Sequence, residues 1–102
     1  MSDKYILRRR ETAARQLGDE TMVLAVLDST LFSLNEIAGI VWRAADGKTP
    51  LREIVANAIV PVFDVGEEAA YRDALELVEG LAGAGILEVA DAPLVAKNES
   101  QS

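Results

Sequence analysis

The sequence predicts an α+β fold in which a three-stranded antiparallel sheet is followed by three helices. Apolar residues between Glu20 and Leu34, interrupted by turn residues, indicate strands. At Asn35 the spacing of apolar residues changes at once to that of a helix, and further helix start and stop signals follow. The 102 residues correspond to one domain with a single modest core.

The three strands are expected at residues 13–17, 20–27 and 30–34. The middle segment consists almost entirely of apolar residues, which is typical of a central strand covered on at least one face. Turn residues at Gly18-Asp19 and Asp28-Ser29 connect it to its neighbours. We therefore expect a meander in which both outer strands keep an open edge.

The third strand, Thr30 to Leu34, presents two different faces. Because successive side chains of a strand point to opposite sides, Leu31 and Ser33 share one face and Phe32 and Leu34 share the other. The sequence does not define which of these faces meets the helices. Phe32 is therefore expected either in the core or in a groove beside it.

The first helix is expected over residues 36–45. Asn35 precedes it as an N-cap, because its side chain accepts a hydrogen bond from a free amide of the first turn. Trp42 of this helix is expected to anchor the core. Gly47 follows the helix and is the residue best able to adopt the positive φ at a helix end.

Two further helices are expected. The second covers residues 50–59, with Thr49-Pro50 as its start signal and Pro61 as its end. The third covers residues 67–82 and begins with acidic residues, which suit the positive end of the helix dipole. Gly83-Ala84-Gly85 stops it.

Both ends of the chain differ in composition from the body. Residues 1–12 are expected to form a basic arm, since residues 1–18 carry five basic and two acidic side chains. The arm is either a solvated tail or a contact for an acidic partner, and its apolar Tyr5-Ile6-Leu7 either pairs locally as a strand or docks on a partner. After the third helix, residues 86–89 can add a short strand, and residues 90–102 are expected to be disordered.

Composition argues against several functional classes. The chain has no cysteine and no histidine, which excludes disulfides, thiolate nucleophiles and Cys/His zinc sites. Its net charge is −7, and the acidic body after residue 18 repels a phosphate backbone, so no nucleic-acid partner is expected. The adjacent carboxylates Glu67 and Glu68 point about 100° apart on a helix and do not share one site. We expect no enzyme activity, metal or cofactor.

The compartment is also suggested by the sequence. The first residues, MSDKYILRRR, have no apolar core followed by a small-residue cleavage site, so no secretory signal is expected. The apolar runs are shorter than the roughly 18 residues of a membrane helix. We therefore expect a cytoplasmic protein without a membrane partner.

Three strands followed by three helices give the order of a winged helix-turn-helix domain, and short motifs add to this pattern. The motifs are Leu17-Gly18-Asp19-Glu20, Leu34-Asn35-Glu36-x-Ala38 with Trp42, Asp46-Gly47-Lys48-Thr49 with Glu53-Ile54, Phe63-Asp64-Val65 with Glu67-Glu68-Ala69, and Leu81 with Gly85-Ile86-Leu87. In this order they resemble the PqqD-like family, which comprises protein D of pyrroloquinoline quinone (PQQ) biosynthesis and related recognition elements of ribosomally made, modified peptides (RiPPs). The resemblance covers about residues 13–90 and assigns residues 13–89 to a PqqD-like domain.

The resemblance implies a non-catalytic domain that binds the leader segment of a precursor peptide and presents it to a modifying enzyme, often a radical SAM protein. The leader would add as a fourth strand to the sheet, with side chains in an apolar groove between the third strand and the third helix. Carried onto this chain, the peptide-binding residues are Thr30, Leu31, Phe32, Ser33, Leu34, Tyr71, Ala74, Leu75 and Val78. PQQ biosynthesis and other modified-peptide pathways both stay open, as do the precursor and the partner enzyme.

Two other functions also stay open. A winged-helix DNA-binding regulator would need a basic recognition helix, whereas the second and third helices carry only Arg52 and Arg72 as cations. A structural module that forms a homodimer through the open edge of the third strand is the other possibility. Tyr71 is compatible with groove lining and with ordinary packing at the boundary of the core.

Overall fold

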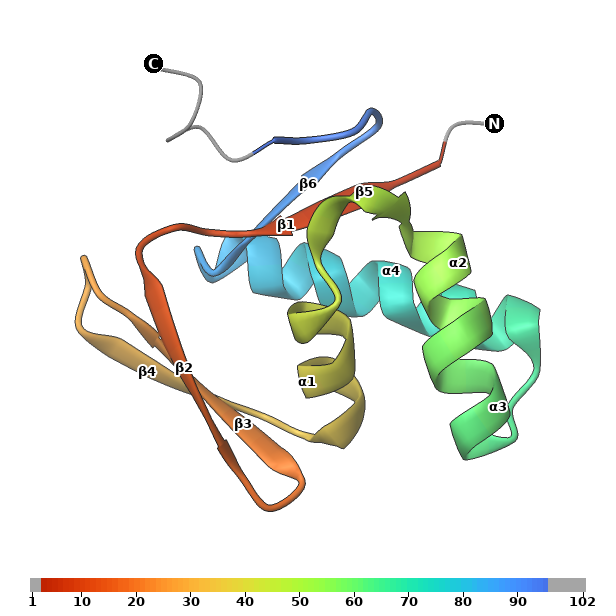
Figure 1. Ribbon diagram of the computed structural model, residues 1–102, viewed down its shortest axis with the longest axis horizontal. Helices are drawn as coiled ribbons and strands as arrows, with labels where there is room; N and C mark the ends of the chain where they lie inside the picture. Colours follow the sequence, from red (N-terminus) through yellow and green to blue (C-terminus); the bar gives the residue numbers. More distant parts are fainter. Residues whose placement is uncertain (1–2, 96–102) are drawn as a thin grey trace.

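The computed structural model describes residues 3–95, which form two three-stranded antiparallel sheets and a set of helices (Figure 1). One sheet has the order β2-β3-β4, with strands β2 (Thr12–Leu17), β3 (Glu20–Ala25) and β4 (Thr30–Leu34). The other has the order β5-β1-β6, with strands β1 (Tyr5–Arg8), β5 (Asp46–Pro50) and β6 (Leu87–Ala90). The helices are α1 (Glu36–Arg43), α2 (Leu51–Ile54), the π-helical segment η1 (Val55–Ile59), α3 (Val60–Phe63) and α4 (Glu67–Gly83). The α+β class is confirmed, and the second sheet is an addition.

The sheet β2-β3-β4 is the predicted meander with β3 in the middle. Its turns contain left-handed backbone, with φ of +62° at Gly18 and +54° at Ser29. β3 ends at Ala25, earlier than expected, because the chain turns directly after it, and the N–H of Ser29 donates to the carbonyl of Val26 (3.3 Å). In Figure 1 this sheet projects from the helical part of the molecule.

Burial shows which face of this sheet meets the helices. Val23 is fully buried and lies opposite Phe32 in the ladder. Phe32 is half-buried and packs against the core, and Leu34 is 5% exposed. Phe32 and Leu34 therefore face inward, whereas Leu31 and Ser33 face outward. This resolves the alternative that the sequence left open.

Helix α1 confirms the predicted cap and anchor. The side-chain oxygen Oδ1 of Asn35 accepts a hydrogen bond from the N–H of Ala38 (2.9 Å). Trp42 is 5% exposed, and its Nε1–H donates to the carbonyl of Ile86 (2.9 Å). The guanidinium of Arg8 lies 5.8 Å from the centre of the Trp42 ring. Helix α1, which follows β4 in the chain, is thus held by a side-chain hydrogen bond to the segment that precedes β6.

Residues 5–8 lie in the expected basic arm, yet they form β1, the central strand of the second sheet. Ile6 is fully buried there. Next to β1, the Lys4 ammonium donates to Asp91 Oδ1 (2.6 Å), and this hydrogen bond raises the pKa of Lys4. Of the alternatives left open for Tyr5-Ile6-Leu7, the structure thus shows strand pairing, but with strands from distant parts of the chain on both edges and not with a local neighbour.

Residues 46–50 form β5, where the sequence predicts a helix end followed by a helix start. The Asp46 carboxylate Oδ1 accepts hydrogen bonds from the N–H groups of Thr49 and Lys48 (2.9 Å each), and these bonds lower the pKa of Asp46. Gly47 has the expected positive φ, +78°. Pro50 has extended backbone, with ψ of 144°, so α2 begins one residue later.

The second predicted helix runs past its expected end at Pro61. Helices α2 and α3 are continuous through η1, and α3 ends at Phe63 with Asp64 in a left-handed conformation (φ 53°). Pro61 lies in the first turn of α3, directly after the π-helical segment. The helix accommodates proline at this point because the π-helical segment has already interrupted the regular hydrogen-bond ladder.

Helix α4 ends within one residue of its prediction. After β6, the N–H of Leu94 donates to the carbonyl of Gly47 (2.8 Å), so part of the expected tail has defined contacts. The remainder of the predicted disordered segment, residues 96–102, lies outside the described residues. Within residues 3–95, no helix combines the length and hydrophobicity needed to cross a bilayer.

Gly39 of α1 is expected to be intolerant of a side chain. A Cβ there would lie 2.5 Å from Oγ1 of Thr21, which is 1% exposed. A clash in a buried position costs up to about 3 kcal/mol, and the better helix propensity of alanine offsets about 1 kcal/mol. Gly39→Ala should therefore lower the free energy of unfolding by about 2 kcal/mol in chemical denaturation.

The matched control removes the clashing atom instead. In a Gly39→Ala/Thr21→Ala double variant the loss of stability should be smaller than the sum of the two single losses. Additive losses would show that α1 and β3 do not meet at this point.

The carboxylate of Asp46 is expected to stabilise the fold in a pH-dependent way. Its pKa is lower when folded, so its contribution is present above the unfolded pKa of about 3.9 and is lost as the pH falls through the folded value. Asp46→Ala should lower the free energy of unfolding at pH 7 by about 1 kcal/mol. Denaturation curves of both proteins at pH 7 and about pH 3 measure this loss, which should be smaller at the lower pH.

Asp46→Asn is the matched variant, since it keeps the acceptor oxygen and removes the charge. It should lose less stability than Asp46→Ala. A loss for Asp46→Ala that is the same at both pH values would contradict the assigned role of the charge.

Candidate peptide-binding site

The outer strands of the sheet β2-β3-β4 each keep one edge unpaired among residues 3–95. In an antiparallel ladder, the N–H and C=O groups of alternate residues point to opposite sides of a strand. The N–H of Val26 donates to the carbonyl of Glu11 (2.9 Å), so Val26 points toward β2. Leu24 lies two residues before Val26, so its backbone N–H and C=O groups also point toward β2. Those of Val23 point toward β4.

The orientation of β3 determines that of β4. Phe32 lies opposite Val23 and exchanges hydrogen bonds with it, so its backbone groups point toward β3. Leu31 and Ser33 consequently direct their N–H and C=O groups toward the open edge. Both residues are exposed, and Leu31 is 59% exposed. β4 therefore offers backbone donors and acceptors at two positions to a further strand.

The inner side of this edge is apolar and lies near α1. Helix α1 contacts both β4 and α4, the two elements predicted to flank the peptide. Of the predicted α4 residues, Val78 is fully buried and Ala74 is 7% exposed, and both belong to the core. In this conformation they are not accessible to a peptide. Among the four, Tyr71 and Leu75 are half-buried and keep accessible surface.

Tyr71 contacts a cationic side chain, a contact that was not predicted from the sequence. The guanidinium of Arg52, from α2, lies 4.0 Å from the centre of the Tyr71 ring. Arg52 Nη1 is also 3.8 Å from Glu68 Oε2. Tyr71 thus takes part in packing between α2 and α4, and Arg52 covers one face of its ring.

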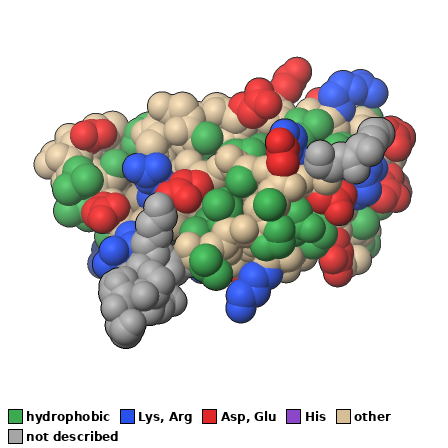
Figure 2. Space-filling model, turned by 90° about the horizontal axis from the view of Figure 1, so that it is seen from above, with side chains coloured by type: hydrophobic (Ala, Val, Ile, Leu, Met, Phe, Trp, Pro, Cys, Tyr) green, Lys and Arg blue, Asp and Glu red, His purple; other side chains and the backbone are tan. Residues whose placement is uncertain are grey.

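Charge is distributed unevenly over the surface. Figure 2 shows acidic side chains, with some basic ones among them, at the end of the molecule formed by α2, α3 and the start of α4. The first turn of α4 contributes Glu67 and Glu68, both exposed. Basic residues instead concentrate around the end of β1 and the start of β2. The open edge of β4 belongs to neither cluster.

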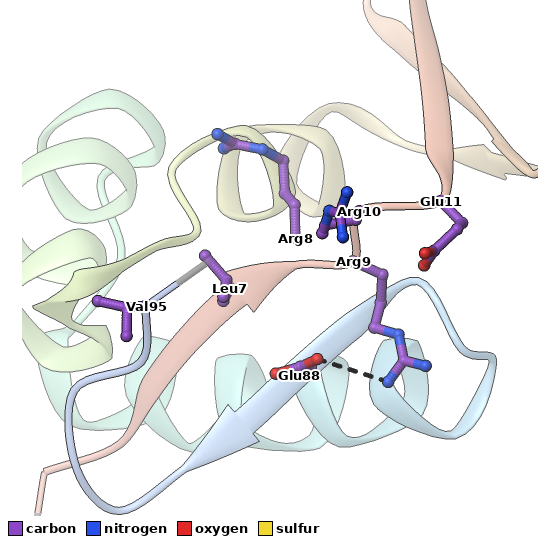
Figure 3. Close-up of a pocket in the computed structure, with 7 residues that line it drawn as sticks. All are labelled: Leu7, Arg8, Arg9, Arg10, Glu11, Glu88 and Val95. Carbon is purple, nitrogen blue, oxygen red and sulfur yellow. Dashed lines mark ion pairs between the residues drawn. The ribbon is translucent and has the colours of Figure 1, made fainter. Parts of the chain in front are cut away.

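A small cavity of about 150 Å³ lies beside the end of β1 and is lined in part by Arg8, Arg9 and Arg10 (Figure 3). Arg9 is turned toward Glu88 on β6, with 3.7 Å between Nη1 and Oε2. Arg8 points to the other side, where its guanidinium donates to the carbonyl of Arg43. Two of the three arginines are therefore engaged within the chain, and this cavity is separate from the β4 edge.

Comparison with protein families identifies the domain. The family described as "Coenzyme PQQ synthesis protein D (PqqD)" matches residues 20–87. The chain belongs to the PqqD family. The matched region contains β3, β4 and all the helices, and it leaves β1 and β2 outside.

A solved structure shares the fold of this PqqD family member. It is described as "TbiB1 in Complex with the TbiA(beta) Leader Peptide", and it aligns with a TM-score of 0.71 at 23% sequence identity. The alignment covers 80% of this chain and 94% of that chain. A search among curated proteins found no match.

The structure brings only part of the predicted site together. Residues 30–34 form one strand, whereas Ala74 and Val78 face the core. The free backbone groups of β4 were not predicted from the sequence, although a signal for them was present. The two-residue turn at Gly18-Asp19 implies a hydrogen bond from the N–H of Glu20 to the carbonyl of Leu17, which fixes the orientation of every later residue in the meander.

The orientation of β4 is expected to be visible in amide hydrogen exchange. The amides of Phe32 and Leu34 donate to β3 and should exchange slowly, whereas those of Leu31 and Ser33 should exchange rapidly. Two-dimensional NMR spectra recorded after transfer to deuterated water measure both sets. The opposite pattern would show that the backbone groups of Phe32 and Leu34, and not those of Leu31 and Ser33, point to the open edge.

Proposed function

We propose that this chain binds the leader segment of a ribosomally made precursor peptide and presents it to a modifying enzyme. The observation that carries the proposal is the open edge of β4, with free backbone groups at Leu31 and Ser33. An extended peptide that pairs with this edge gains main-chain hydrogen bonds, and its alternate side chains provide specificity. The leader peptide in the TbiB1 complex and membership of the PqqD family support this function.

The β4 edge suits a peptide better than the β2 edge. On β4, the inward-facing residue beside the edge that keeps accessible surface is Phe32, which packs against the core, whereas Leu34 is itself buried in the core. On β2, the corresponding inward-facing positions include Ala14 and Gln16, and the Gln16 side chain accepts a hydrogen bond from Arg43 (2.7 Å). A peptide on β4 can therefore bury apolar side chains that a peptide on β2 cannot.

In this proposal the protein acts as a non-catalytic peptide chaperone. The recipient enzyme is proposed to be a radical SAM protein, as the family resemblance implies. The order of strands and helices supports a winged helix-turn-helix arrangement, in which the sheet forms the wing. The groove between β4 and α4 is proposed as the place where inward-facing leader side chains bind, with Tyr71 and Leu75 as its accessible α4 residues.

The surface charge does not favour the DNA-binding alternative. Helix α4 carries one cation, Arg72, and several carboxylates, among them Glu67, Asp73 and Glu76. DNA affinity depends on clustered cations that displace counterions from the phosphate backbone. A homodimer through the β4 edge would use the same backbone groups as the leader, so the two kinds of complex would compete.

Proline at the free edge is expected to weaken peptide binding strongly. Ser33→Pro removes an N–H that points away from β3 and leaves the pairing of β3 with β4 intact. A displayed library of random peptides, selected on the full chain, supplies a binding peptide for titration. Ser33→Pro should weaken the binding of this peptide by roughly tenfold or more. The titration is monitored through the amide chemical shifts of residues 30–34.

Ala14→Pro is the matched control, because it removes an outward-pointing N–H from the other open edge, on β2. This variant should bind the selected peptide as the unmodified chain does. Unchanged binding by a folded Ser33→Pro variant would exclude strand addition at β4. Sedimentation of each variant shows whether a homodimer occupies the edge instead.

A further inference from the structure

The outer face of the sheet β2-β3-β4 carries an apolar surface that the proposed function does not use. A wide, open hollow of about 460 Å³ lies on this face and is lined by Ala13, Arg15, Leu17, Met22, Leu24 and Leu31, among others. Leu17, Leu24 and Leu31 are 54%, 37% and 59% exposed, although each is large and apolar. A concentration of exposed apolar side chains on one face of a small domain marks a contact surface.

The ladder register divides this surface into rows that run across the sheet. Ala13, Leu24 and Leu31 lie opposite one another and form an apolar row that ends at the β4 edge. Arg15, Met22 and Ser33 form the next row, which is polar at both ends. At the β4 edge, an apolar position on the outer face is therefore followed by a polar one.

We propose that the row Leu24–Leu31 is a second specificity site for the bound peptide, and that it selects an aliphatic residue opposite Leu31. The inference rests on the proposed strand addition at β4. A peptide strand would lie about 4.8 Å from β4, and its side chains would alternate between the two faces of the sheet in register with those of β4. The peptide residue opposite Leu31 must then point outward and extend the row.

The neighbours of this position define its chemistry. Leu31 and Leu24 offer only apolar atoms to a side chain beside them. The cation of the hollow, Arg15, lies on the same face but on β2, at the opposite edge of the sheet. An aliphatic side chain there covers Leu31, which is otherwise 59% exposed. The peptide residue opposite Ser33 lies instead beside a hydroxyl that donates to Glu20 (3.3 Å) and is not selected as apolar.

The strongest test changes the specificity of the position. The random-peptide selection is repeated with Leu31→Glu, which places a carboxylate next to the selected residue. The preferred residue at one peptide position should change from aliphatic to lysine or arginine, because opposite charges across a strand pair attract. A purely structural role of Leu31 would not produce this change.

Leu17→Glu is the matched control, because Leu17 has a similar exposed fraction but lies on β2, away from the β4 edge. It should leave the selected sequences unchanged. In addition, Leu31→Thr should weaken binding of the peptide selected by the unmodified chain by about tenfold. Leu17→Thr should bind that peptide normally.

The outcomes separate this inference from the proposed function. If Ser33→Pro abolishes binding while Leu31→Glu and Leu31→Thr change neither preference nor affinity, strand addition stands and the outer row is not a specificity site. If Ser33→Pro has no effect, or no peptide is selected, the proposed function and this inference both fail. If Leu31→Glu dissolves a dimer and leaves the peptide preference unchanged, the row serves a second copy of the chain and the inference is wrong.

Discussion

The pairing of β1 with both β5 and β6 is the constraint on which the remaining architecture depends. These strands come from the start, the middle and the end of the described chain, so their sheet ties together three distant segments. β1 pairs with both β5 and β6, and these three strands form a sheet of their own that does not extend the sheet β2-β3-β4. The open edge at β4 is thus a consequence of how the rest of the chain closes on itself.

Within the open sheet, one tight turn sets the orientation of the functional backbone groups. The turn at Gly18-Asp19 pairs Leu17 with Glu20, and strict alternation along β3 and β4 then directs Leu31 and Ser33 outward. A shift of register by one residue would reverse both the free backbone groups and the side-chain faces. The buried inner face, with Val23 and Leu34, prevents such a shift.

Features specified by neighbouring residues were predictable, and features specified by distant partners were not. The meander, the Asn35 cap and α4 follow from local turn, cap and periodicity signals. Residues 46–50 carry little strand signal of their own, and the apolar Tyr5-Ile6-Leu7 does not reveal its partners, since both segments pair with strands that are distant in the sequence. The predicted site was limited in the same way. The periodicity of α4 defines apolar stripes, but only packing against other elements places Ala74 and Val78 in the core.

The short length of β4 bears on how a peptide is recognised. Leu31 and Ser33 offer two donors and two acceptors, and each hydrogen bond contributes a net stabilisation of about 0.5–1.5 kcal/mol. Association itself costs at least about 4 kcal/mol, so main-chain bonds at this edge leave little net affinity. Apolar side chains must supply most of the remainder, and Phe32 on the inner face and Leu31 on the outer face are the two that flank the edge. In the proposed complex the backbone therefore sets the register, and the sequence of the peptide is selected on both faces of the sheet.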